Sequence, residues 1–273
     1  MEKFGAIRNR LLSTVLASVS LLSWQNSVLA ETSPEEKEKI TETRRRMEAS
    51  DSLLQGLTIF EQGAQNVKPE IAAAFVEGKT QGKGKWFLLS KPEAVDEENA
   101  SVDFGELQDY LDKATDDEKK QIRFVHSHPD ALKRHKTDVS FEKDGQKFAT
   151  ANMIPSLQDY DSLMQKIIVM DKETPIQELI YAERTQEYVE FSVDESKQLV
   201  SDVLKSENAA EGSKKFETEL INNAPFARSI LLFGKNMETG DQAKARENLE
   251  RMLQGFDENG LKFRIIPKIE MIK

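Results

Sequence analysis

Short apolar runs alternate with amphipathic helical segments through the middle of the chain, and this alternation most constrains the fold. The runs at 71–76 and 85–89 have strand length and are separated by a glycine-rich turn. Further strands are expected at 122–125, 178–182 and 188–193, and helices at 107–114 and 155–168. Such alternation predicts an α/β or α+β core.

Two further segments flank this expected core. Ser33-Pro34-Glu35-Glu36 is a capping box with Pro at the first helical position, and it predicts a charged helix that runs towards residue 66. The first half of that helix is polar enough to project as a solvated arm. At the other end, a helix over 242–253 and a strand over 261–267 indicate a C-terminal α/β extension. The expected organisation is an N-terminal helical arm at 31–66, a central domain at 67–195 and the extension at 196–273.

The first thirty residues predict export. The segment 1–10 is basic, 11–24 is mostly apolar, and Val28-Leu29-Ala30 places compact residues before Glu31. The apolar run is short for crossing a bilayer core of about 30 Å. We therefore expect a signal peptide at 1–30 that is cleaved after Ala30. The mature protein is then secreted or periplasmic and meets a membrane only during export.

Composition excludes several classes of protein. The chain has no cysteine, which rules out disulfide scaffolds, thiolate zinc sites and cysteine nucleophiles. Its formal net charge is −10, and the +2 carried by the first thirty residues leaves −12 on the rest. An acidic surface repels phosphate backbones, so no nucleic-acid partner is expected.

Two of the three histidines stand one residue apart at the end of an expected strand, in His126-Ser127-His128-Pro129. Side chains at i and i+2 of a strand point to the same face, so both imidazoles can bind one metal ion. For this motif alone, a pair of surface histidines without a metal is the plain alternative.

Two other short patterns bear on the histidines. Ser156 stands three residues before Asp159 at the start of an amphipathic helix, where Ser as N-cap and Asp in the first turn are also common without any ligand. Glu70 follows Pro69 directly before the apolar run at 71–76. A single Glu at the start of a strand is usually just solvated.

Taken in this order, Glu70, His126-Ser127-His128-Pro129 and Pro155-Ser156-Leu157-Gln158-Asp159 resemble the motifs of the JAMM (MPN-plus) zinc metalloprotease family. The resemblance covers about residues 52–195. It implies a JAMM-like fold, which is a mixed β-sheet flanked by helices with the layering of cytidine deaminases, and it implies one zinc ion. The implied zinc ligands are His126, His128 and Asp159.

The resemblance also implies a reaction. Two imidazoles and one carboxylate leave the fourth zinc position for water, which the ion makes more acidic. Glu70 would be the general base and Ser156 the donor to the oxyanion. The implied activity is hydrolysis of an amide or isopeptide bond in a peptide or protein, and a ubiquitin-like tail on lysine is one candidate. A catalytically inactive JAMM-like scaffold or peptide-binding module is the alternative.

The sequence departs from the family pattern between the ligands. Family members place the Ser and Asp much closer to the second His, whereas His128 and Asp159 are 31 positions apart here. Residues 130–153 are therefore an insertion, charged and irregular in pattern, that can cover the groove, act as a lid or bind a partner. The insertion offers His135 and Asp138 as rival ligands. Asp159 is preferred because of its Ser-x-x-Asp context and because a basic run surrounds His135.

A second departure lies upstream. Ala72-Ala73-Ala74 stands where the family commonly has a Gly, although alanine is still small enough for close packing. Glu77 is a rival base. We favour Glu70 because Glu77 has the opposite strand parity and lacks the preceding proline.

Overall fold

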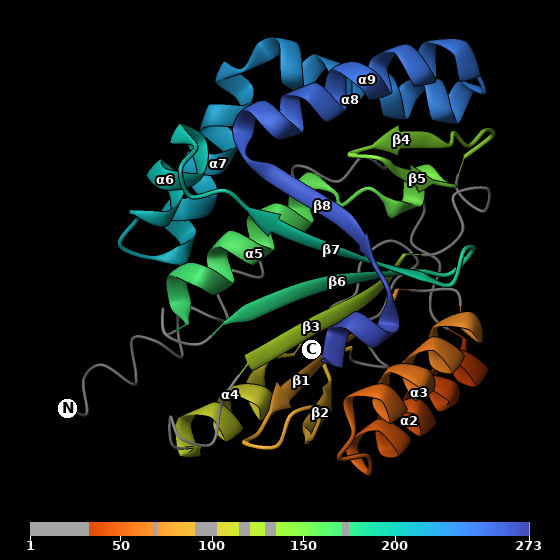
Figure 1. Cartoon of the computed structure of the whole chain (residues 1–273), viewed down its shortest axis with the longest axis vertical. Coiled ribbons are helices and arrows are strands. Elements are labelled where there is room, and N and C mark those ends of the chain that lie inside the picture. Colours follow the sequence, from red (N-terminus) through yellow and green to blue (C-terminus); the bar gives the residue numbers. More distant parts are fainter. Residues whose placement is uncertain are drawn as a thin grey trace.

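A computed structural model describes residues 33–67, 70–90, 103–114, 121–128, 135–170 and 175–272 and shows a mixed α/β fold built on one large sheet (Figure 1). The expected signal peptide, Pro69, Pro129 and the basic residues Lys133 and Arg134 lie outside these ranges. Within them, no helix combines the length and the apolar character that a membrane crossing requires.

Six strands form the large sheet in the order β2-β1-β3-β6-β7-β8. Neighbouring strands are antiparallel, except that β3 and β6 are parallel. The strands are β1 (Ala72–Glu77), β2 (Gly84–Leu88), β3 (Gln121–His128), β6 (Ile176–Ala182), β7 (Glu187–Val193) and β8 (Leu261–Ile266). The predicted mixed sheet is confirmed, and each predicted strand overlaps an observed one.

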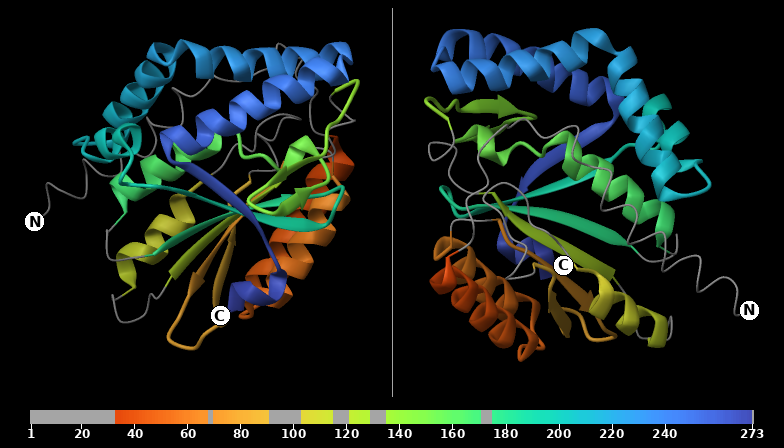
Figure 2. Two further views of the ribbon diagram at one scale, coloured as in Figure 1. Left: turned by 45° about the horizontal axis from the view of Figure 1, so that its top comes forward. Right: turned by 180° about the vertical axis from the view of Figure 1, so that it is seen from behind.

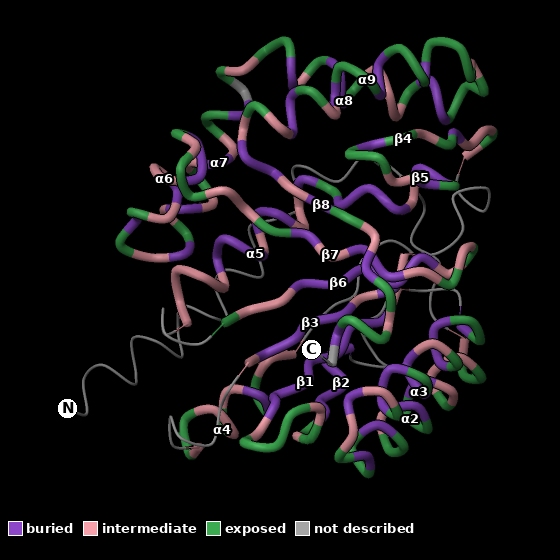
Figure 3. The backbone as a smooth tube through the Cα atoms, viewed as in Figure 1, coloured by how far each residue is buried: buried purple, intermediate pink, exposed green. Residues whose placement is uncertain are grey.

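Helices cover both faces of this sheet (Figure 2). One face packs against α2 and α3, and the other against α4, α5 and the helices that follow β7. The strands at the centre are largely buried between these layers (Figure 3). The helices are α2 (Pro34–Glu48), α3 (Leu53–Gln65), α4 (Gly105–Lys113), α5 (Leu157–Val169), α6 (Gln198–Leu204), α7 (Ala209–Asn222), α8 (Ala224–Thr239) and α9 (Gln242–Asn259).

The single charged helix expected to run towards residue 66 is two helices, α2 and α3, and the expected solvated arm is wrong because α2 packs on α3 and β2. Ile40 and Met47 have exposed fractions of only 1% and 0%. The two helices approach closely at Gly63, where an added Cβ would lie 2.6 Å from Cγ2 of Thr43. This close approach allows a helix with few apolar side chains to bury a narrow stripe.

The expectation that the insertion has no regular structure is also wrong for its described part. β4 (Phe141–Lys143) and β5 (Gln146–Phe148) form an antiparallel hairpin. Asp144 and Gly145 connect them with φ angles of 52° and 76°, and a two-residue type I′ turn requires positive φ at both positions. The ring centroids of Phe148 and Phe263 lie 5.3 Å apart, so the hairpin packs against β8.

The C-terminal extension shares the sheet and the core of the preceding residues. β8 pairs with β7 along its whole length, from Tyr188 opposite Ile266 to Val193 opposite Leu261. Phe256 of α9 packs edge-on against Tyr160 of α5, with ring centroids 5.6 Å apart. Residues 196–272 therefore support the helix that carries the candidate site.

The docking of α2 is testable by truncating its most buried side chain. Met47→Ala is expected to lower the free energy of unfolding by about 2–5 kcal/mol, because it removes fully buried methylene groups and leaves a cavity. Urea denaturation of the mature protein measures the change. Glu38→Ala, at an exposed position of the same helix, should change it by less than about 0.5 kcal/mol. Equal effects of the two substitutions would contradict the packing of α2.

Candidate metal centre

His126 and His128 lie at the C-terminal end of β3, on the face of the sheet that α5 covers. Their Nε2 atoms are 3.1 Å apart and their ring centroids 4.9 Å apart, so both rings turn towards the same point. Ala72 stands directly opposite His126 on β1. Its small side chain leaves room for the imidazole beside it.

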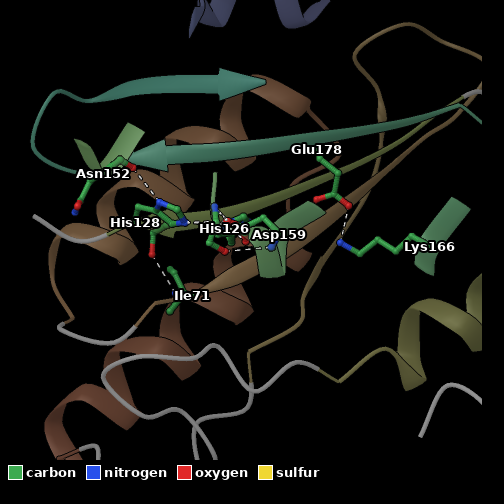
Figure 4. A network of polar contacts seen from close by, with 9 residues as sticks. Ile71, His126, His128, Asn152, Asp159, Lys166 and Glu178 are labelled. Atoms are coloured by element: carbon green, nitrogen blue, oxygen red, sulfur yellow. Dashed lines mark hydrogen bonds and ion pairs between the residues drawn. The ribbon is translucent and has the colours of Figure 1, made fainter. Parts of the chain in front are cut away.

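Asp159 reaches this point from the first turn of α5. Ser156 is the N-cap, and the two residues form the capping box: Ser156 Oγ accepts a hydrogen bond from Asp159 N–H at 3.2 Å, and Asp159 Oδ2 accepts one from Ser156 N–H at 2.7 Å. Asp159 Oδ1 lies 3.1 Å from His126 Nε2, and Oδ2 lies 3.6 Å from His128 Nε2. The cap therefore orients the carboxylate towards the histidines (Figure 4).

Among the described residues, His126, His128 and Asp159 form a group that can hold a metal ion, with ligand-type atoms all within 4.8 Å of one another. The three side chains have exposed fractions of 14–16%, so the group is shielded but reachable. The structure thus brings together the three ligands proposed from the sequence. Two imidazole nitrogens and one carboxylate oxygen are the donor set of catalytic zinc sites, which keep one position open.

The backbone carbonyl of Asn152 completes the surroundings of His128. It accepts a hydrogen bond from His128 Nδ1 at 2.9 Å. A carbonyl only accepts, so the proton of a neutral His128 ring sits on Nδ1 and the lone pair of Nε2 faces Asp159 and His126. Such a second hydrogen bond is typical of metal-binding histidines.

Charges within the group are mutually dependent. Burial disfavours the charged form of His128, but the Asp159 carboxylate outweighs it, with contributions from Glu70 and the Asn152 carbonyl, and raises the pKa of His128. Burial also disfavours the charged carboxylate, yet His126 and His128 hold the pKa of Asp159 well below its usual range. In the absence of a metal, the two groups therefore favour each other's charged form: the carboxylate favours a proton on His128, and the imidazoles favour the ionised carboxylate. A metal ion must displace that proton.

Glu70 precedes β1 by two residues, at the end of that strand that pairs with the histidine end of β3. The β1–β3 register pairs Ala72 with His126, and Ser127 N–H donates to the Ile71 carbonyl at 2.9 Å, so continuing this register by one residue would set Glu70 beside His128. Its charge acts on His128 in the direction described above. Ser127 fixes this approach from the other face, because its hydroxyl accepts a hydrogen bond from Ile71 N–H at 3.0 Å. Glu70 is therefore placed near the group without belonging to its ligands.

The rival residues have other contacts. Glu77 lies at the far end of β1, buried in an ion pair with Arg123 whose N–O distance is 2.6 Å. Asp138 accepts hydrogen bonds from two backbone N–H groups and pairs with Arg184. His135 is not a member of the described ligand group. The geometry thus favours Asp159 over these rivals as the ligand, and it places Glu77 at the end of β1 away from the histidines.

Three features near the site escaped sequence reasoning. Strand parity places Ser127 on the opposite face, but no pattern reveals its bond to Ile71. The Asn152 carbonyl belongs to the backbone and leaves no side-chain signal. The third feature is an ion pair between the half-buried Lys166 and the buried Glu178, with an N–O distance of 2.5 Å, two turns along α5 from Asp159 (Figure 4). Burial of Glu178 raises its pKa despite the attraction of Lys166.

Metal content tests the group directly. Purified protein dialysed against zinc is expected to hold about one ion per chain, and His128→Ala to lose most of it, because one of three protein ligands is removed. Elemental analysis by mass spectrometry measures both. His135→Ala is the matched control and should retain the ion. Equal zinc content in wild type and His128→Ala would rule out this metal site.

The protonation of the metal-free group is a second test. Asp159→Asn is expected to lower the pKa of His128, because it removes the carboxylate that stabilises the imidazolium. NMR titration of the ring measures the shift, with His135 as an internal reference. Since the folded pKa of His128 is raised, its contribution to stability is full below the ordinary histidine pKa and is lost as pH rises through the folded value. Zinc affinity should rise over the same interval. An unchanged His128 pKa would contradict the coupling.

No family model, no curated protein and no solved structure matches this chain. The case for a metal centre therefore rests on the geometry of the site. A strand of the mixed β-sheet carries two histidines, and a helix on that sheet brings an aspartate that is distant in sequence to the same point.

Proposed function

We propose that the protein is an exported zinc-dependent metallopeptidase of the JAMM type, which hydrolyses an amide or isopeptide bond in a peptide or protein. The observation that carries the proposal is the gathering of His126, His128 and Asp159 within 4.8 Å, with Glu70 two residues before the neighbouring strand and its charge acting on His128. The order of these residues in the chain and the mixed sheet that holds them support the same assignment.

His126, His128 and Asp159 would hold one zinc ion. When bound, zinc polarises a water molecule and lowers its pKa towards neutrality. The chain prepares its ligands for this task in two ways. The Asn152 carbonyl holds the Nδ1 proton of His128 and leaves Nε2 free to bind. The capping box engages Oδ2 of Asp159 and leaves Oδ1 facing Nε2 of His126.

Glu70 would transfer the proton, and Ser156 would stabilise the negative charge that develops on the substrate. The Glu70 carboxylate accepts a proton from the attacking water and returns it to the leaving amine. Ser156 Oγ uses a lone pair to accept the Asp159 N–H, so its own O–H proton is available to donate to the oxyanion that develops on the attacked carbonyl. Ser156 is exposed, as a group that meets a substrate must be.

A second candidate is a non-catalytic JAMM-like scaffold or peptide-binding module. The capping box favours it, because Ser156 and Asp159 stabilise the start of α5 whether or not a metal is present. Metal binding without hydrolysis would point to this candidate.

Glu70→Gln separates the two candidates. If Glu70 is the general base, the substitution should lower the rate of hydrolysis by about 10²- to 10⁴-fold and leave zinc content unchanged. Zinc-loaded protein is incubated with a peptide mixture and with lysine isopeptide reporters, and new termini are counted by mass spectrometry. Cleavage should also stop with a chelator and return with zinc.

Glu106→Gln, at an exposed position of α4, is the control and should leave cleavage unchanged. Full activity in Glu70→Gln would reject this mechanism. Absence of cleavage by the zinc-loaded wild type on both substrate classes would favour the scaffold.

A further inference from the structure

The described part of the insertion, from residue 135 onwards, is anchored at the edge of the sheet. The side-chain amide of Gln146 donates to the Ile265 carbonyl at 3.0 Å and accepts from the Ile265 N–H at 2.8 Å, as a neighbouring strand would. Lys143 forms an ion pair with Asp257 of α9, with an N–O distance of 2.8 Å. These contacts hold the hairpin on β8 and α9.

A single carboxylate closes the base of the insertion. Asp138 Oδ1 accepts hydrogen bonds from Val139 N–H at 2.8 Å and from Ala151 N–H at 2.9 Å, so it joins the two ends of the segment that contains the hairpin. Asp138 Oδ2 pairs with Arg184 in the β6–β7 turn at 2.7 Å. The Asp138 side chain is only 8% exposed. We call residues 138, 139, 151 and 184 the clasp.

The clasp lies next to the contacts of His128. Directly after Ala151, the Asn152 carbonyl accepts the hydrogen bond from His128 Nδ1. Directly before Arg184, the Glu183 N–H donates to the His128 carbonyl at 3.1 Å. Asp138 thus binds the direct neighbours of the two residues that hold His128. Asn152 holds its side chain, and Glu183 holds its backbone.

We propose that Asp138 is a positioning residue, which fixes the tautomer and orientation of His128 through the clasp. The inference rests on the proposed metal centre. In this role the insertion is a fixed support for one ligand, and the residue that resembled a rival ligand in the sequence acts on the site through Asn152. Loss of the Asp138 carboxylate frees Ala151 N–H and lets the Asn152 carbonyl move away from the ring. His128 then loses the contact that keeps its proton on Nδ1.

The test uses the full mature chain and two readouts that need no substrate. In metal-free wild type, long-range ¹H–¹⁵N NMR above the pKa of the ring should show His128 protonated on Nδ1. In Asp138→Ala the same spectra should show a mixture of tautomers. Zinc affinity, from competition with a chromophoric chelator, should weaken by about 10- to 100-fold.

Two variants control for other causes. Glu142→Ala removes an exposed acid of the same insertion and should match wild type in both readouts. Asp138→Asn keeps an oxygen that can accept the two backbone N–H groups and should restore most of the affinity that Asp138→Ala loses. If circular dichroism shows that Asp138→Ala does not fold, Arg184→Gln replaces it. An Nδ1–H tautomer and an affinity within twofold of wild type in a folded clasp variant would overturn the proposal.

The outcomes separate this inference from the proposed function. If the wild type binds zinc but cleaves nothing, the proposed peptidase activity is rejected and the positioning role of Asp138 still stands. A wild type that binds no zinc removes the metal centre, and with it this inference.

Discussion

The carboxylate of Asp159 joins a helix to a strand, and the candidate site depends on that contact. One oxygen satisfies a backbone N–H at the start of α5, and the other faces the imidazole of His126. A helix presents a new side chain every 100° or so, so a register shift of one residue in α5 would turn Asp159 away. The N-cap at Ser156 fixes that register. A local stabilising motif thereby sets the geometry of a group assembled from distant segments.

The helix is held at a second point along the same face. Lys166 lies two turns beyond Asp159 and reaches Glu178 on β6, and its Nζ also sits 4.3 Å from the ring centroid of Phe124 on β3. An ion pair this buried is weak evidence for stability, because desolvation offsets much of the attraction. It does, however, restrict how α5 tilts over the sheet. Together with the buried apolar side chains of α5, these two polar contacts hold Asp159 beside the histidines.

Much of the site was accessible from the sequence because local rules govern it. The period of a strand places His126 and His128 on one face, and Ser-x-x-Asp at a helix start is a capping pattern. What sequence reasoning missed depends on tertiary contacts. The docking of α2 requires the close approach of α2 and α3 at Gly63. The regular structure of the insertion requires the side-chain amide of Gln146 to bond to the backbone of β8. Neither contact has a periodic signature.

Anomalous X-ray diffraction at the zinc edge, from crystals grown with zinc, tests the central claim most directly. The account predicts a single strong peak about 2.0–2.1 Å from Nε2 of both His126 and His128 and about 2.0–2.2 Å from a carboxylate oxygen of Asp159. A peak elsewhere in the molecule, with these three side chains still bonded only to one another, would contradict it.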